Sequence, residues 1–272
     1  MNNNIIKEII DLNKMIITTL FIIKFITTIL LVLILSLLAE YVSPKVSGII
    51  SGIPTGTALI LFFYGLENGT QFASESSLFN LVGMLSMQVF IYLYFIFSTK
   101  NTKTNIFISS IIATIGYLFV VFLLKQFNFN LLYALIVPLI SIPLFTYIFK
   151  KINDSTIKNK VKLSPEILFI RAIVASLVIL IITGIAQFVG PKWAGLLSAF
   201  PTTLFPLILI IHSTYGKENV HTIIKNVPKG QWSMVIYVIS IFYLYPLLGV
   251  YLGTLISYSF VVLYLLVLFK KN

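Results

Sequence analysis

Long apolar runs, separated by short polar segments, make up most of this sequence. Each run is about as long as the ~20 residues that an α-helix needs to cross the roughly 30 Å hydrocarbon core of a bilayer. The polar segments between them are too short to form a soluble domain. The pattern predicts an all-α polytopic membrane protein. Nine transmembrane helices are expected, at about 17–41, 46–65, 78–98, 105–124, 130–149, 166–188, 193–214, 230–248 and 251–269.

The composition agrees with a membrane location. Apolar residues make up 58% of the chain, charged residues 10%, and the mean hydropathy is +1.03, whereas soluble domains carry about 25% charged residues. The absence of Cys excludes disulfides, thiolate metal sites and cysteine nucleophiles. Residues 1–16 place Ile5, Ile6, Ile9 and Ile10 at helical spacing, which predicts an interfacial helix rather than a cleaved signal peptide.

The net charge of +11 is explained by topology, so we expect no nucleic-acid partner. The segment 150–162 carries five lysines and one acid, which marks it as cytoplasmic under the positive-inside rule. With nine crossings, 13 of the 19 basic residues then fall on the cytoplasmic side. We therefore expect a multi-pass protein of the plasma (inner) membrane, with the N-terminus outside and the C-terminus in the cytoplasm.

The chain contains an internal repeat. Residues 39–55 and 186–202 align without a gap at an offset of 147 residues, with eight of seventeen positions identical, including Pro, Lys, Gly, Ser and Thr. The alignment predicts two repeats of four helices each, 17–125 and 164–272, joined by a connector helix and basic loop at 126–163. Five crossings separate equivalent helices, so the second repeat is inverted. Inverted repeats are typical of secondary transporters, although duplication in a non-transporting protein is the alternative.

Each repeat carries the motif Pro-Lys-x-x-Gly-x-x-Ser-x-x-Pro-Thr. Its first proline can begin a helix, and its second lies ten residues later, about 15 Å along that helix and close to the bilayer midplane. There it must break the helix and free a carbonyl. Nearby hydroxyls could serve that carbonyl or a ligand, and the break could favour an anion or a cation. The candidate substrate-binding residues are Ser51, Pro54, Thr55, Thr57, Ser198, Pro201, Thr202 and Thr203.

Ionisable residues within the predicted spans are the next candidates, because such groups usually line a cavity, pair or snorkel to the interface. Lys24 and Arg171 are equivalent in the two repeats, so they could guard opposite mouths of an anion path, although snorkelling is expected for either alone. Glu40 could pair with Lys45 or couple protons. The charged gate candidates are Lys24, Glu40, Lys45, Arg171, Gln187 and Lys192; His212 is a further candidate, or a satisfied interfacial residue.

Motifs of hydrolases, intramembrane proteases and nucleotide-driven pumps are missing from the sequence. We expect no catalytic residues, no metal site and no cofactor, and thus no enzyme. The preferred hypothesis is a secondary transporter or passive carrier of a small polar or anionic metabolite, working by alternating access. The alternatives are a lipid flippase or scramblase acting on phosphate-bearing lipids, and a non-transporting scaffold that recruits a partner through its basic loop. The expected partners are a small molecule or lipid and the membrane.

Residues 194–233 resemble the GlpM-like family of small bacterial inner-membrane proteins, which carry a single copy of the repeat. The similarity runs through Ala194, Gly195, Leu196, Phe200, Pro201, Thr202, His212, Gly216, Gly230, Trp232 and Ser233. The first repeat departs from it, with Gly65 in place of His212 and Leu85 in place of Trp232. The resemblance implies a membrane protein linked to glycerol or envelope polysaccharide metabolism. It also implies that this chain is a fused form of an antiparallel dimer.

Overall fold

The computed structural model describes residues 18–19, 21–30, 33–34, 43–155 and 165–271. All regular structure in these residues is helical, and six helices among them are long and apolar enough to cross a membrane. The protein is therefore an α-helical membrane protein. The expected interfacial helix at 1–16 and most of the basic loop lie outside the described residues. The total of nine transmembrane helices stays a prediction.

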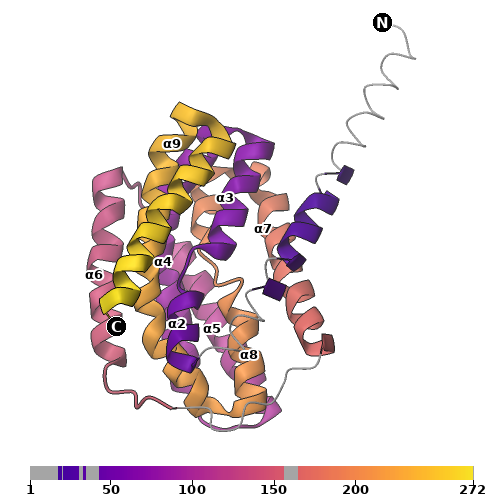
Figure 1. Ribbon diagram of the computed structural model, residues 1–272, viewed down its shortest axis with the longest axis vertical. Helices are drawn as coiled ribbons and strands as arrows, with labels where there is room; N and C mark the ends of the chain where they lie inside the picture. Colours follow the sequence, from indigo (N-terminus) through magenta and orange to yellow (C-terminus); the bar gives the residue numbers. More distant parts are fainter. Residues whose placement is uncertain (1–17, 20, 31–32, 35–42, 156–164, 272) are drawn as a thin grey trace, which may run out of the picture.

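The helices labelled in Figure 1 are α2 (Pro44–Ser51), α3 (Thr55–Asn68), α4 (Thr70–Phe97), α5 (Lys103–Leu124), α6 (Leu131–Phe149), α7 (Pro165–Ser198), α8 (Leu204–Tyr215) and α9 (Lys217–Lys271). Short connections join α2 to α3, α4, α5 and α6 in turn, and α7 to α8 and α9 (Figure 1). An apolar helix at Phe21–Leu30 precedes them and lies beside α7.

Four glycines with positive φ mark corners of the chain. Gly69 (φ 90°) and Gly216 (φ 86°) follow the ends of α3 and α8, while Gly190 (φ 76°) and Gly249 (φ 75°) interrupt α7 and α9. Other residues rarely adopt this backbone conformation, because a Cβ clashes with the backbone there. The break at Gly249 lets α9 run across the molecule and return beside itself, as Figure 1 shows.

Helix boundaries recur at the offset of 147 residues. The helix Pro44–Ser51 matches the last segment of α7, which follows Gly190 and ends at Ser198. The ends of α3 and α8, at Asn68 and Tyr215, are related in the same way. The two halves of the chain therefore change direction at equivalent positions, and their division into repeats stays a prediction.

Two helices begin well before the membrane spans that were predicted within them. Helices α4 and α9 begin at Thr70 and Lys217, whereas the hydropathy pattern placed the starts of the spans near 78 and 230. The missed segments are rich in polar residues, but several of these are buried: Ser74 donates to the Phe242 carbonyl at 2.7 Å. Buried hydroxyls that find a carbonyl are tolerated inside a protein, so polarity there did not indicate a loop.

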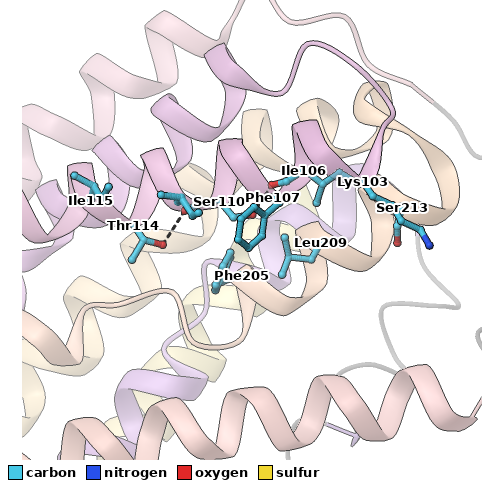
Figure 2. Close-up of a pocket in the computed structure, with 10 residues that line it drawn as sticks. Lys103, Ile106, Phe107, Ser110, Thr114, Ile115, Phe205, Leu209 and Ser213 are labelled. Carbon is cyan, nitrogen blue, oxygen red and sulfur yellow. Dashed lines mark hydrogen bonds between the residues drawn. The ribbon is translucent and has the colours of Figure 1, made fainter.

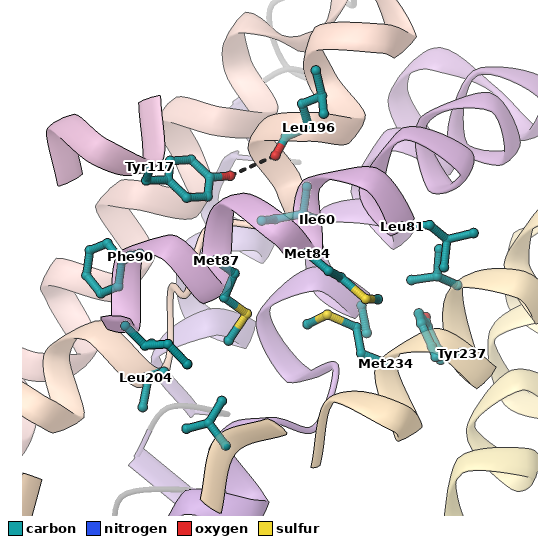
Figure 3. Packing of buried hydrophobic residues seen from close by; sticks show 14 of the residues in the cluster. Ile60, Leu81, Met84, Met87, Phe90, Tyr117, Leu196, Leu204, Met234 and Tyr237 are labelled. Atoms are coloured by element: carbon teal, nitrogen blue, oxygen red, sulfur yellow. Dashed lines mark hydrogen bonds between the residues drawn. The ribbon is translucent and has the colours of Figure 1, made fainter. Parts of the chain in front are cut away.

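The interior is built around α4 and α9. Helix α4 contacts α3, α5, α6, α7 and α9, and α9 contacts α2, α3, α6 and α8 as well. Their shared core is apolar, and Figure 3 shows Met84, Met87 and Met234 facing one another within it. The outer faces of α5 and α6 are also apolar, with Phe107 66% exposed. Such surfaces are suited to contact with lipid.

Candidate functional site

The two predicted helix breaks are present. Helix α2 ends at Ser51 and α3 begins at Thr55, while α7 ends at Ser198 and α8 begins at Leu204. A proline lies in each gap. Each helix ends there because the proline ring clashes with the preceding turn and proline has no amide N–H to donate. The same tight turn surrounds both prolines. The amides of Thr55 and Thr202 donate to the carbonyls of Ile53 and Phe200, each at 2.7 Å.

The two breaks meet in the interior. The hydroxyl oxygens of Thr55 and Thr203 lie 3.3 Å apart, within hydrogen-bonding distance. The Thr57 hydroxyl donates to the Ser198 carbonyl at 3.1 Å. All four residues are buried. We call this meeting point, formed by Thr55, Thr57, Ser198, Thr202 and Thr203, the crossing. The structure thus brings together hydroxyls that are more than 140 residues apart in sequence.

Two polar atoms, one in the crossing and one beside it, lack partners. Thr202 Oγ1 and Asn80 Oδ1 are buried and have no hydrogen-bond partner within the described chain. The Asn80 amide donates to the Ser198 hydroxyl at 2.7 Å, and that hydroxyl donates to the Gly195 carbonyl at 2.7 Å. A buried polar atom left unpaired costs about 1–3 kcal/mol. These two atoms therefore keep hydrogen-bonding capacity that the surrounding described residues do not use.

Asn80 was missed from the sequence. It lies on α4, near the edge of a predicted span, and is fully buried. A polar amide at the edge of an apolar run was the only available signal, since no motif includes it. Ser51, which was predicted, has its hydroxyl bonded to the Ser47 carbonyl of its own helix at 2.8 Å. The two serines of the motif therefore differ: Ser198 belongs to the crossing, and Ser51 is engaged locally.

Helix ends set the electrostatics of the crossing. Both α3 and α8 begin here, and neither has a side-chain cap at its N-terminus. Uncapped N-termini leave amide donors free and carry a partial positive charge. The Thr202 hydroxyl lies against Gly56 in the first turn of α3, where a Cβ would overlap it. The partial positive charge of two helix N-termini beside an unpaired hydroxyl favours an anionic or neutral polar ligand over a cation.

The charged gate candidates do not form one group. Lys24 is 5% exposed, and its ammonium contacts the Glu67 carboxylate at 2.6 Å and the Thr183 hydroxyl at 3.0 Å. The expected snorkelling of Lys24 was therefore wrong, because an acid at the end of α3 binds the ammonium inside the protein. Lys45 and Gln187 are exposed. Lys192 donates to the Asn128 side chain at 2.9 Å. Glu40 and the side chain of Arg171 lie outside the described residues, so the equivalence of Lys24 and Arg171 stays untested.

His212 is buried at the end of α8. One ring nitrogen lies 2.9 Å from the Tyr94 hydroxyl and the other 3.1 Å from the Lys100 carbonyl. Both nitrogens are therefore engaged, and the ring ties α8 to α4 and to the loop that follows α4. This geometry is that of a satisfied structural residue. Within the part of the chain that is described, there is no group of acidic and His residues that could hold a metal ion.

Comparisons with known proteins add no relatives. No family model, curated protein or solved structure shows significant similarity to this chain. The resemblance of residues 194–233 to the GlpM-like family therefore depends on the matching residues alone.

Proposed function

We propose that the protein is a secondary transporter or passive carrier of a small polar or anionic metabolite, with the crossing as its substrate site. One observation carries the proposal: the buried, unpartnered Thr202 hydroxyl lies between two uncapped helix N-termini, where α3 and α8 begin. Such donors, held in an apolar interior, would bind an anion or a polar group far more tightly than donors in water.

Inverted repeats support a transport role. The matching boundaries of α2 and the last segment of α7, and those of α3 and α8, are what two repeats of opposite orientation would produce. We count the Phe21–Leu30 helix as one span, α2 with α3 as one, and the last segment of α7 with α8 as one. With α7 and α9 divided at Gly190 and Gly249, this gives the nine transmembrane spans that we propose. In such proteins the substrate site lies near the midplane, between the repeats, and broken helices form it. The site that we call the crossing is likewise formed by two broken helices, one from each proposed repeat.

The topology is part of the same proposal. The loops after α4 and before α9 are joined, since the Lys217 amide donates to the Asn101 side chain at 2.8 Å. Lys225 pairs with Asp154, which follows α6, at 3.1 Å. These lysine-bearing segments therefore gather at one end of the molecule, and we assign that end to the cytoplasm of a plasma membrane.

Alternating access would separate the two breaks. In this structure Thr55 and Thr203 are in contact, so the crossing is closed between them. Movement of one repeat against the other would part these hydroxyls and expose the helix N-termini first to one side and then to the other. Opening would break two hydrogen bonds between the breaks, Thr55 with Thr203 and Thr57 with the Ser198 carbonyl. Such bonds between membrane helices are worth about 1 kcal/mol each, so they alone would not prevent opening.

A flux assay tests the proposal. Purified protein in vesicles is offered radiolabelled sn-glycerol 3-phosphate, succinate or glycerol, and uptake is compared with empty vesicles. We expect protein-dependent uptake of at least one probe, lowered about tenfold or more by Thr202→Val, since a hydrogen bond to a charged group is lost. The matched control is Thr146→Val, because the Thr146 hydroxyl bonds its own helix at 2.7 Å, outside the crossing. Equal uptake by both variants would exclude the crossing as the site.

A lipid flippase or scramblase is the second candidate. It is favoured by an apolar cavity that opens between α5 and α8 and ends close to the crossing, at Phe205. Vesicles containing a fluorescent phosphatidylglycerol test it, because the outer-leaflet label can be reduced chemically. Protein-dependent loss of more than half of the fluorescence would favour lipid movement. Loss of about half, as in empty vesicles, would exclude it.

A further inference from the structure

A groove runs between α5 and α8. Its volume is about 690 Å³, and Figure 2 shows its lining as two rows of side chains. Lys103 and Ser213 lie at one end, and Thr114 and Phe205 lie at the other. The eleven residue steps from Lys103 to Thr114 span about 17 Å of helix, which is about half of the roughly 30 Å hydrocarbon core. The groove therefore has the depth of one leaflet.

The polar groups along the groove are already satisfied. The hydroxyls of Ser110, Thr114 and Ser213 donate to carbonyls of their own helices at 2.7, 2.8 and 2.9 Å. The remaining lining is apolar apart from Lys103 at the mouth. A polar solute would therefore gain no hydrogen bonds inside the groove, whereas an acyl chain would fit the apolar lining.

The mouth of the groove is positive. Lys103 is exposed, and no carboxylate of the described residues lies within 4 Å of its ammonium. It is also the first residue of α5, so the positive end of that helix dipole adds to its charge. Lysines at a membrane interface attract anionic head groups. Apolar depth and a cationic mouth together match an anionic phospholipid.

The helix pair that corresponds to α5 and α8 in the other proposed repeat leaves no groove between its members. At the offset of 147 residues, α5 corresponds to the last segment of α9, and α8 corresponds to α3. There the rings of Phe62 and Tyr251 meet with centroids 5.9 Å apart, and a Cβ on Gly65 would lie 2.7 Å from the Val250 side chain. The two helices are thus packed directly in one half and separated by a groove in the other.

We propose that the groove is a binding site for one anionic phospholipid of the leaflet at the Lys103 end, with an acyl chain between α5 and α8 and its phosphate on Lys103. The chain end reaches Phe205, whose amide bonds the Pro201 carbonyl at 2.8 Å and whose ring packs against Phe90 at 5.3 Å. The lipid would thus contact the helix turn next to the crossing. The binding site itself does not depend on the proposed transport function.

Quenching by brominated lipids tests the proposal. The two native tryptophans are removed by Trp193→Phe and Trp232→Phe, and a reporter is introduced by Leu209→Trp in the groove. A second reporter, Leu247→Trp, samples bulk lipid, because Leu247 is 75% exposed outside the groove. The full-length protein is placed in phosphatidylcholine vesicles containing a minor fraction of phosphatidylglycerol, and either lipid carries bromine on its acyl chains.

We expect brominated phosphatidylglycerol to quench the reporter at position 209 preferentially, and to show no preference at position 247. Lys103→Gln should weaken the preference at position 209 about fivefold, the contribution of one lysine near a membrane surface. Lys45→Gln, at another exposed lysine, should leave it unchanged. Thr114→Phe, which fills the deep end, should reduce quenching while the protein elutes as folded wild type does.

Three results would overturn the proposal. Equal quenching by both lipids at positions 209 and 247 would mean that the groove holds ordinary boundary lipid. Absence of quenching at position 209 would mean that protein, either another segment or a second copy, covers the groove. A preference that survives Lys103→Gln unchanged would remove the phosphate contact from the site.

Discussion

Gly52 and Gly230 pack backbone to backbone. A Cβ built on Gly52 would lie 2.8 Å from the Cα of Gly230, and one built on Gly230 would lie 2.9 Å from the Cα of Gly52. The equivalent pair is Ala199 and Gly83, where a Cβ on Gly83 would lie 2.8 Å from that of Ala199. These contacts press α2 against α9 and the last segment of α7 against α4. Close backbone approach at small residues is how helices associate in lipid, and here it places both proline breaks at the centre.

Gly230→Ala should destabilise the protein. The added methyl would meet the carbonyl of Ile49 as well as the Gly52 backbone, and neither can move without shifting a helix. Overpacking of this kind costs about 1–3 kcal/mol. Thermal unfolding in detergent measures the loss. Gly184→Ala is the matched control, because nothing lies within 4 Å of a Cβ there, and alanine favours a helix over glycine. Equal melting temperatures for the two variants would contradict the close contact.

Thr57→Val should lower stability by about 1 kcal/mol, because the Ser198 carbonyl loses the hydroxyl that links the two breaks. Valine keeps the shape of threonine, so the change isolates the hydrogen bond. Thr146→Val, which removes a hydroxyl bonded within its own helix, should have a smaller effect. Reversible unfolding by denaturant in mixed micelles gives both values. A Thr57 variant as stable as the Thr146 variant would argue against a bond between the breaks.

Lys24 and Glu67 should show coupled effects on stability. Lys24→Met leaves the Glu67 carboxylate without its cation, and we expect a loss of about 1–2 kcal/mol. This is less than for a fully buried pair, because the Glu67 side chain is 22% exposed and water screens part of the attraction. The double variant Lys24→Met, Glu67→Gln should be more stable than the sum of the single changes predicts. Additive losses would mean that the pair does not form. Lys45→Met, at an exposed site, should change little.

His212→Leu should destabilise the protein by about 1–3 kcal/mol, because the Tyr94 hydroxyl and the Lys100 carbonyl both lose their partner. Adding Tyr94→Phe should recover part of the loss, since one of the two unpaired groups is then removed. Transport of a responsive probe, measured at equal amounts of folded protein, should be unchanged by His212→Leu. Loss of transport at full stability would assign His212 a functional role instead of a structural one.

Local patterns predicted much of the site. The prolines at 54 and 201 broke their helices as expected, because a proline blocks the hydrogen bond of its own turn whatever surrounds it. The duplicated motif also indicated that the two breaks would resemble each other. The hydropathy pattern did not show that α4 and α9 begin before the predicted spans, at Thr70 and Lys217. Hydropathy cannot distinguish a polar loop from a polar helix face that is buried against a neighbour.

The sequence alone determined that this chain consists largely of apolar membrane helices and at which prolines two of these helices break. It also determined that the two halves of the chain share a repeated motif. These properties depend on side-chain transfer to lipid and on backbone chemistry within a few residues. Only the tertiary structure decided that Thr55 meets Thr203, that Asn80 joins Ser198 and that Lys24 is held by Glu67. Each of these partners is chosen by packing between helices far apart in sequence, where the nearest available polar group satisfies a charge or hydroxyl that lipid cannot.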